Sequence, residues 1–391
     1  MPKLLRITTA PISLNVLLPG QMKYMREQGF DVLMVSSDGP ELAKVLEREG
    51  CRHHIIPMTR KMSPFADLRC LWLLYRLFLK EKPDSVHSHT PKAGLLAMLA
   101  AKMAGVKFRL HTIAGLRYVT TKGMSRRILI AMEKLTGMAA THVWPNSGSM
   151  KAFIEKNQLV TPRKLEVIGW GSSNGVNLQR YHPAALKEEK LNDVKALVKY
   201  DPDLFYFLSV GRLVHDKGMD ELVGAFARVH ALHPHTRLIL VGAFEDEVDP
   251  VSDTAREMIK THPAIIAAGW SDAVEYFMHF SNVLVHPSHR EGFPNVLMQA
   301  GAMSCPIICS AIDGNTDIVR HRETGLLFEV KNEVALFDQM QSAINEPAVM
   351  KEMAGQLLLQ IQTHYDQRVV QSFLHQKYRQ LIYRHTKATG N

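Results

Sequence analysis

The segment NVLVHPSHREGFPNVLMQA, residues 282–300, carries the pattern that decides the fold. A short apolar run is followed by a polar loop with one glycine, and then by a second apolar run of helical character. Pro294 suits the first position of that helix, because its missing N–H would be unpaired there in any case. The N–H groups of Asn295 and Val296 would then point out of the helix end, with the positive end of the helix dipole behind them. The segment therefore predicts a strand, a loop and a helix N-terminus at which a phosphate would bind well.

The same alternation of strand and helix patterns runs along the rest of the chain and predicts doubly wound, largely parallel α/β sheets. In the C-terminal half the other expected strands are FYFLSVGRL (205–213), TRLILVGA (236–243), AIIAAGW (264–270) and CPIICSA (305–311). In the N-terminal half they are LLRITTA (4–10), FDVLMVSS (30–37), DSVHSH (84–89), VKFRLHT (106–112), ATHVWPN (140–146) and KLEVIG (164–169). Helices are expected between them, the first over residues 15–28.

The chain of 391 residues is too long for one core and suggests two domains. A stretch rich in Gly, Ser and Asn at 170–190 breaks the rhythm and is typical of a linker. We therefore expect an N-terminal Rossmann-like domain over 1–177 and a second one over 178–365. Residues 366–391 are expected to form a helix that returns to the N-terminal domain. Ligands of such sheets bind at the carboxyl ends of the strands.

The segment SVGRLVHDKGMDELVGAF, residues 209–226, repeats the strand–loop–helix pattern and adds two cations. Arg212 and Lys217 lie in the loop, and the helix is expected to start near Gly218. Two cations and a helix N-terminus suit a diphosphate, which needs neutralising charge and N–H donors. The alternative is two surface cations beside a turn.

Glu291 repels phosphate and is better placed to accept hydrogen bonds from hydroxyls just beyond it. Gln299 lies on the same helix face as Asn295 and Val296, and it could reach a second set of hydroxyls. Sugar hydroxyls, a diphosphate and ribose hydroxyls together form the layout of a nucleotide sugar. That is our hypothesis for the ligand.

The composition is that of an ordinary soluble protein, with 46% hydrophobic and 22% charged residues. The start of the chain shows no signal-peptide pattern, and the most apolar window, residues 68–83, carries Arg69, Arg76 and Lys80 among its charges and is too short to span a bilayer. Four cysteines provide no disulfide framework, and no His or second Cys pair beside Cys305 and Cys309 completes a zinc site. We expect reduced cysteines and a cytoplasmic protein, with peripheral attachment to the inner membrane as an option.

The net charge of +9 is unevenly distributed. Residues 1–170 contain 26 Lys and Arg against 12 Asp and Glu, and residues 171–391 contain 21 against 26. The N-terminal half therefore carries a net charge of +14, which suits nucleic acid, an anionic membrane or a phosphorylated substrate. The alternative is a basic surface that maintains solubility. We find no motif for reading nucleic acid bases.

The chain resembles the retaining family 4 glycosyltransferases over almost its whole length. The resemblance rests on GRL…KG (211–218), PSHREGFPNVLMQAGAM (287–303), DGNTDIV…ETGLLF (313–328), VHSHTPKAG (86–94), LHTIAGLR (110–117) and IGWGSSNGVNL (168–178). The family implies the GT-B fold, in which two Rossmann-like domains face each other across a cleft.

The resemblance also implies roles for individual residues. The catalytic residues would be His111, Arg212, Lys217 and Glu291. The nucleotide sugar would be bound by Gly211, Arg212, Lys217, Trp270, Glu291, Gly292, Phe293, Pro294, Asn295, Val296 and Gln299. The acceptor would be bound by His89, Arg117 and Lys122. The alternatives are a structural role for His111 and a core position for His89.

The sequence departs from the family pattern in three places. Gln299 stands where the family has a second acid that binds the ribose hydroxyls. The glycine pair usual after the first strand is missing, which puts the acceptor-side loop in doubt. Asp317 stands in place of a later Glu.

The implied reaction is a front-face transfer that retains the anomeric configuration, with a nucleotide sugar, expected to be a UDP-sugar, as donor. No cofactor or metal ion is expected, because two cations can stabilise the leaving group. The expected acceptor is a glycan, attached to a polyprenyl diphosphate or soluble. An anionic membrane surface near residues 117–134 is a further expected partner, and nucleic acid is not. A sugar-nucleotide 2-epimerase of the same fold and a non-catalytic anion-binding protein are the alternatives.

Overall fold

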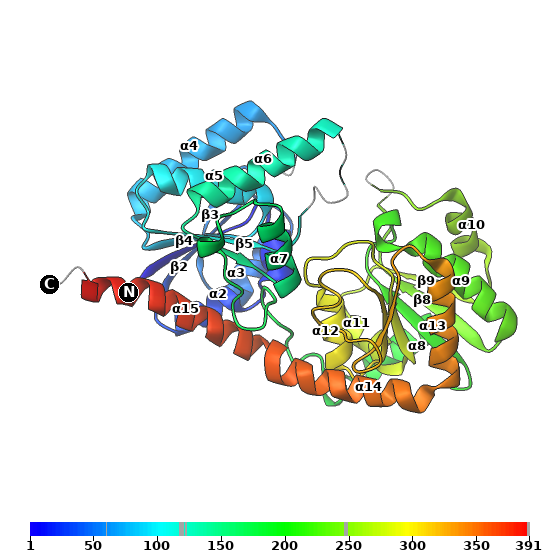
Figure 1. Ribbon diagram of the computed structural model, residues 1–391. Helices are drawn as coiled ribbons and strands as arrows, with labels where there is room; N and C mark the ends of the chain where they lie inside the picture. The colour runs from blue at the N-terminus through cyan, green and yellow to red at the C-terminus, as the bar shows by residue number, and fades with distance from the viewer. Residues whose placement is uncertain (60, 117–120, 122, 246–248, 389–391) are drawn as a thin grey trace. The chain divides into compact units, whose positions relative to one another are not determined.

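The computed structural model describes residues 1–59, 61–116, 121, 123–245 and 249–388 (Figure 1). The chain divides into two compact units. The N-terminal unit comprises residues 1–175 together with 368–391, and the C-terminal unit comprises 176–367. The expected domain boundaries lie two residues from these. Within the described ranges, no helix is long and apolar enough to cross a membrane.

The N-terminal unit is built on a parallel sheet that has six strands within the described residues. Its strands are β1 (Lys3–Ile7), β2 (Asp31–Ser36), β3 (Arg52–Ile55), β4 (Ser85–Ser88), β5 (Phe108–Ile113) and β6 (His142–Pro145). Their order is β3-β2-β1-β4-β5-β6, which is the order of a doubly wound dinucleotide-binding sheet.

Helices cover both faces of this sheet (Figure 1). They are α1 (Pro11–Leu17), α2 (Gln21–Glu27), α3 (Leu42–Glu49), α4 (Pro64–Glu81), α5 (Pro91–Met103), α6 (Gly123–Ala139), α7 (Gly148–Lys156) and α15 (Gln367–Ala388). Helices α4 to α7 pack on one face, and α1, α2, α3 and α15 pack on the other. The last helix of the chain therefore completes the core of the first unit.

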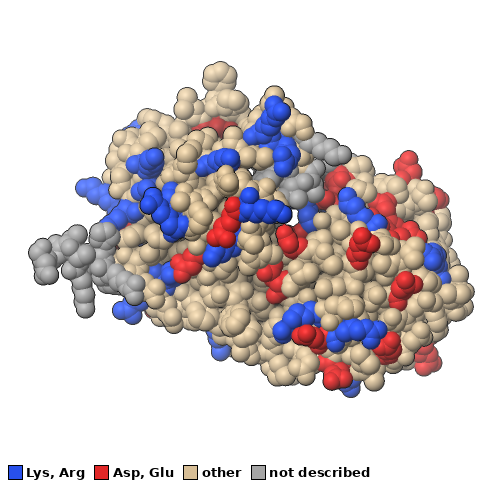
Figure 2. Space-filling model, in the orientation of Figure 1, with Lys and Arg blue, Asp and Glu red and all other residues tan. Residues whose placement is uncertain are grey.

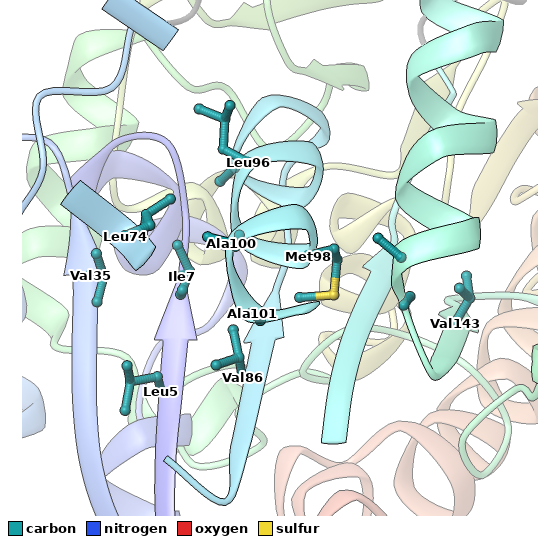
Figure 3. Close-up of a cluster of buried hydrophobic side chains, with 14 of the residues drawn as sticks. Leu5, Ile7, Val35, Leu74, Val86, Leu96, Met98, Ala100, Ala101 and Val143 are labelled. Carbon is teal, nitrogen blue, oxygen red and sulfur yellow. The ribbon is translucent and has the colours of Figure 1, made fainter. Parts of the chain in front are cut away.

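Strand β1 shows why both faces need covering. Its side chains alternate, so that Leu5 and Ile7 face the core beneath α4 and α5, while Leu4 faces the core beneath α15. In Figure 3, Leu5 and Ile7 lie opposite Leu74 of α4 and the small side chains of α5. Alanines on α5 allow that helix to lie close to the strands.

A buried polar network joins α15 to the sheet. Arg6 of β1 is fully buried, and its guanidinium donates hydrogen bonds to the Tyr378 hydroxyl (2.5 Å) and to Gln21. The Tyr378 hydroxyl lies 2.5 Å from His87 Nδ1 of β4. Burial raises the pKa of Tyr378 to about 12, against the opposing charge of Arg6, so the phenol stays protonated. Removing either partner would leave a buried polar group unpaired.

The C-terminal unit repeats the topology with its own six parallel strands, counted within the described residues. They are β7 (Phe205–Val210), β8 (Thr236–Val241), β9 (Ile265–Gly269), β10 (Val283–His286), β11 (Ile307–Ser310) and β12 (Leu326–Phe328), in the order β12-β11-β10-β7-β8-β9. Two such sheets confirm the predicted α/β architecture.

The helices of this unit are α8 (Glu188–Leu197), α9 (Met219–Leu232), α10 (Asp253–Thr261), α11 (Val274–Phe280), α12 (Asn295–Ala302), α13 (Glu333–Asn345) and α14 (Pro347–Gln360). Helices α8, α11 and α12 pack on one face of the sheet, and α9, α10 and α13 pack on the other. Helix α14 contributes to both cores.

Two of the sequence predictions for the N-terminal half are wrong. Segment 164–169 is not a strand: Leu165 makes a single bridge to Val143, and the chain then turns at Gly169, whose φ is +58°. The helix expected over 15–28 is two helices, α1 and α2, which are separated at Pro19 and Gly20. Gly20 has φ +75°, which a continuing helix does not permit.

Candidate functional site

Two neighbouring strands of the C-terminal unit bring the predicted residues to one edge of the sheet. Strands β7 and β10 pair in parallel, so the loops that follow them, 211–218 and 287–294, start side by side. Gly218, the residue before α9, has φ +68°, and a Cβ placed there would lie 2.2 Å from the Pro287 carbonyl oxygen. Only glycine permits so close an approach of the two loops.

Asp216 fastens the two loops together. Its carboxylate accepts a hydrogen bond from Arg290 Nε (2.5 Å), and its backbone carbonyl accepts one from the His289 N–H (2.9 Å). Its own N–H donates to Asp249 Oδ2 (2.7 Å). A site formed by both loops is therefore held by side-chain and backbone bonds before any ligand arrives.

Lys217 and Glu291 form an ion pair at this junction. Their side chains are 19% and 14% exposed. His286, the last residue of β10, lies with its Nε2 3.0 Å from Glu291 Oε1. Burial opposes ionisation of Glu291, but the charge of Lys217 and the contact with His286 outweigh it, so the pKa of Glu291 lies below its usual value. The carboxylate is therefore ionised, and both partners contact the same oxygen, Oε1.

The N-terminus of α12 adjoins this pair. Pro294 is the N-cap, in extended conformation at φ −74° and ψ 113°, and Asn295 is the first helical residue. The prediction that Pro294 occupies the first helical position is therefore wrong by one residue, because ψ of Pro294 lies outside the helical region. The Leu297 N–H donates a hydrogen bond to the Pro294 carbonyl (3.2 Å). The N–H groups of Asn295 and Val296 therefore precede the first hydrogen bond of the helix.

The loops after β10 and β11 also meet. Gly314 has φ +86°, and a Cβ there would lie 2.7 Å from the Gly292 carbonyl oxygen. The Gly314 N–H donates to Asp317 Oδ2 (3.1 Å). Phe293 is buried, with its ring 5.3 Å from that of Tyr365. The segment 292–294 is therefore anchored from both sides.

The remaining predicted residues of this unit follow the ends of β7 and β9 or lie on α12. Arg212, after Gly211 at the end of β7, is paired with Glu245 (2.6 Å) and not with Glu291. Trp270 follows β9 and is largely exposed. Gln299 is half-buried on α12 and interacts with Tyr181, whose pKa burial raises to about 12. Sequence reasoning placed Gln299 correctly on the helix but missed Tyr181.

The predicted residues of the N-terminal unit lie at the carboxyl ends of its central strands. His111 of β5 is buried, with Nδ1 2.9 Å from the Ser88 hydroxyl, and burial lowers its pKa to about 4. A Cβ on Gly94 would lie 2.4 Å from its ring, so α5 holds the imidazole in place. Such a histidine is neutral at physiological pH and can donate or accept one hydrogen bond at its other nitrogen.

His89 follows β4 and lines a small cavity of about 20 Å³, enough for one water molecule. Burial holds the pKa of His89 well below its ordinary value. Among the described residues, both ring nitrogens of His89, the Trp144 indole nitrogen and the Asn146 carbonyl oxygen are buried without a hydrogen-bond partner. All three residues line this cavity, which therefore offers both donors and acceptors. Arg117 and Lys122 lie outside the described residues.

His286 is the principal residue that sequence reasoning missed. The signal was present, because His286 is the polar last residue of an apolar strand and lies five positions before Glu291. Within the described ranges, no group of three or more His, Cys, Asp or Glu side chains could hold a metal ion.

Comparison with known proteins identifies the family of this architecture. A family model described as "Glycosyl transferase 4-like domain" matches residues 16–171, and one described as "Glycosyl transferases group 1" matches 193–356. The capsular polysaccharide biosynthesis glycosyltransferase CapM of Staphylococcus aureus is 32% identical over 366 residues, covering 93% of each chain. The UDP-Gal:alpha-D-GlcNAc-diphosphoundecaprenol alpha-1,3-galactosyltransferase of Escherichia coli is 27% identical, covering 89% of this chain and 90% of that protein. Among solved structures, Anabaena HepE in complex with UDP superposes with a TM-score of 0.79 at 16% identity, covering 97% and 99% of the two chains.

Proposed function

This chain belongs to the group 1 glycosyl transferases, which are enzymes that transfer sugars, and we propose that it moves a sugar from a UDP-sugar to a lipid-linked glycan in surface polysaccharide synthesis. The UDP donor is supported by the E. coli relative, whose name specifies UDP-Gal as the donor. The acceptor class is supported by that relative and by the capsular polysaccharide relative. Both align with nearly the whole chain.

The observation that carries the proposal is the Lys217–Glu291 pair beside the N-terminus of α12. Lys217 and the N–H groups of Asn295 and Val296 supply a charge and donors to a diphosphate. Glu291, held by His286, supplies an acceptor for hydroxyls of the donor sugar. Before the donor binds, Glu291 acts as the counter-ion of Lys217.

In the proposed chemistry the acceptor hydroxyl attacks the anomeric carbon on the face from which the diphosphate departs. The hydroxyl gives its proton to the departing phosphate oxygen. Because attack and departure take place on the same face, the anomeric configuration is retained. Lys217, Arg212 and the helix N–H groups stabilise the charge that develops on the leaving group, which is usually the largest electrostatic contribution. No metal ion is required in this scheme, and activity should persist in EDTA.

A lipid-linked acceptor lies at a membrane surface, and the charge distribution supports peripheral contact with one. The first 170 residues carry a net charge of +14. Figure 2 shows Lys and Arg side chains gathered over the visible face of the N-terminal unit, whereas Asp and Glu are more frequent on that of the C-terminal unit. Anionic lipids attract such clusters within a Debye length of the surface.

The test is a transfer assay with a panel of nucleotide sugars and a short-chain polyprenyl-diphosphate-linked monosaccharide as acceptor, analysed by mass spectrometry and NMR. We expect one UDP-sugar to extend the acceptor with the donor's anomeric configuration retained. Glu291→Gln should abolish transfer, whereas Lys190→Met, an exposed lysine on α8, should not change it. Inversion of configuration would contradict the proposed mechanism. Epimerisation of UDP-N-acetylglucosamine without transfer would favour the alternative enzyme class.

A further inference from the structure

Helix α4 presents an unusual face to solvent. Its inner side chains, Cys70, Leu74, Leu77 and Phe78, are buried in the core of the N-terminal unit. The residues at the opposite helical positions should therefore be polar. Instead, Phe65, Leu68, Trp72 and Leu79 are 91%, 65%, 53% and 46% exposed.

These four apolar residues form one stripe. Their spacing of three, four and seven residues places them on the same side of the helix. Single exposed apolar residues are common and need no explanation. A contiguous apolar stripe that includes two aromatic residues marks an interaction surface.

The same face carries only positive charge. Arg69, Arg76 and Lys80 are exposed between the apolar residues, and the Arg76 guanidinium lies 4.8 Å from the centre of the Trp72 ring. The two acids of the helix are held in ion pairs, Asp67 with Lys92 (2.5 Å) and Glu81 with Lys3 (2.9 Å). We call Phe65, Leu68, Arg69, Trp72, Arg76, Leu79 and Lys80 the α4 face.

Helix α6 extends this character within the same layer. Helix α5 packs against both α4 and α6 (Figure 1). On α6 the exposed side chains include Ile128, Leu135 and Met138 together with Arg127 and Lys134. Two helices of one layer therefore combine exposed apolar side chains with cations.

We propose that the α4 face inserts into the headgroup region of an anionic bilayer, an inference that specifies the surface for the membrane contact proposed above. Apolar and aromatic side chains flanked by Arg and Lys match a surface in which acyl chains lie beneath anionic headgroups. A second copy of the chain fits less well, because a symmetric contact would oppose identical cations. Insertion can be distinguished from adsorption that depends only on charge, because part of the binding by insertion persists at high salt.

The experiment measures the binding of the full-length protein to vesicles of phosphatidylcholine with or without phosphatidylglycerol, at low and high salt. Phe65→Ser/Leu68→Ser/Trp72→Ser should weaken binding to anionic vesicles about tenfold or more at both salt concentrations. Arg69→Ser/Arg76→Ser/Lys80→Ser should weaken it mainly at low salt. The matched control, Val349→Ser/Leu359→Ser, removes exposed apolar residues from α14 and should bind as the unaltered protein does.

Tryptophan fluorescence locates the insertion. Vesicles containing brominated lipid should quench the tryptophan fluorescence of the unaltered protein. The Trp72→Phe variant should lose most of this quenching while still binding the vesicles. Equal vesicle binding by the apolar variant and the unaltered protein would overturn the proposal. A dimer of the unaltered protein in lipid-free solution that the apolar variant dissociates would also overturn it, in favour of a second copy.

The sugar-transfer assay separates this inference from the proposed function. With the short-chain acceptor in solution, the apolar variant should transfer sugar at the unaltered rate, because the α4 face does not include the donor site. Vesicle binding without any transfer activity would contradict the proposed function and leave the surface assignment supported. Transfer activity without vesicle binding would support the proposed function and contradict the surface assignment.

Discussion

Replacing Lys217 by Met tests how the donor site is held before the donor binds. The substitution leaves the Glu291 carboxylate, 14% exposed, with His286 as its remaining hydrogen-bond partner. Removing one partner of a buried ion pair costs about 3–5 kcal/mol, and the contact that His286 keeps with the carboxylate offsets part of that. We expect the free energy of unfolding of the C-terminal unit to fall by about 3 kcal/mol, which lowers Tm by roughly 6–12 °C for a unit of this size.

A double-mutant cycle measured by denaturant unfolding checks this value. Glu291→Gln combined with Lys217→Met should be less destabilised than the two single variants added together, with a coupling of about 2 kcal/mol. The ion pair stabilises the fold at pH values above the ordinary Glu pKa. This stability is lost as the pH falls through the lowered pKa of Glu291. The loss of stability on acidification should therefore be smaller in Lys217→Met. A loss of stability below 1 kcal/mol in Lys217→Met, or strictly additive losses in the double variant, would show that the ion pair does not stabilise the unit.

Three further outcomes are expected. Gly218→Ala should destabilise the protein by about 2 kcal/mol or more in urea unfolding, because Ala is strained at φ +68° and its Cβ would meet the Pro287 carbonyl; a loss under 1 kcal/mol would contradict the close approach of the loops. Burial raises the pKa of Glu133 to about 7, so its folded-state penalty grows as pH rises from 4.5 to 7 and reaches about 3 kcal/mol above that. Glu133→Gln should therefore raise Tm at pH 8 and leave it nearly unchanged at pH 4. Equal shifts of Tm at the two pH values would argue against titration of Glu133 between them. Gln299→Glu should retain transfer and tighten UDP binding up to about tenfold through a charge-assisted hydrogen bond, and calorimetry showing weaker binding would exclude that role.

The strands that bury both faces were predictable, because their apolar runs are visible without knowing their neighbours. The edge strand β3, whose sequence is Arg-His-His-Ile, was missed because an edge strand that is largely exposed needs no apolar run. Segment 164–169 has the composition of a strand, but its register allows only one bridge. The residue composition of a segment does not indicate whether its backbone pairs with a neighbouring strand.

The candidate site likewise has features that the sequence predicts and features that it does not. The loop cations, Glu291 and the start of α12 follow from local patterns in the sequence. The partners do not: Glu291 with Lys217, and Arg6 with Tyr378, lie 74 and 372 residues apart in the sequence. Which of several cations an acid meets is decided by the tertiary fold, as the pairing of Arg212 with Glu245 shows.

Calorimetric titration with UDP measures whether Lys217 binds the diphosphate and Glu291 the sugar. We expect UDP to bind more tightly than ATP or NAD and Lys217→Met to weaken UDP binding at least about tenfold. Glu291→Gln should keep UDP affinity within a few-fold of the unaltered protein, because its carboxylate is assigned to the sugar, and Lys190→Met should change nothing. Equal UDP affinity in Lys217→Met and the unaltered protein, or a loss in Glu291→Gln as large as in Lys217→Met, would contradict the assignment of the diphosphate to Lys217 and of the sugar to Glu291.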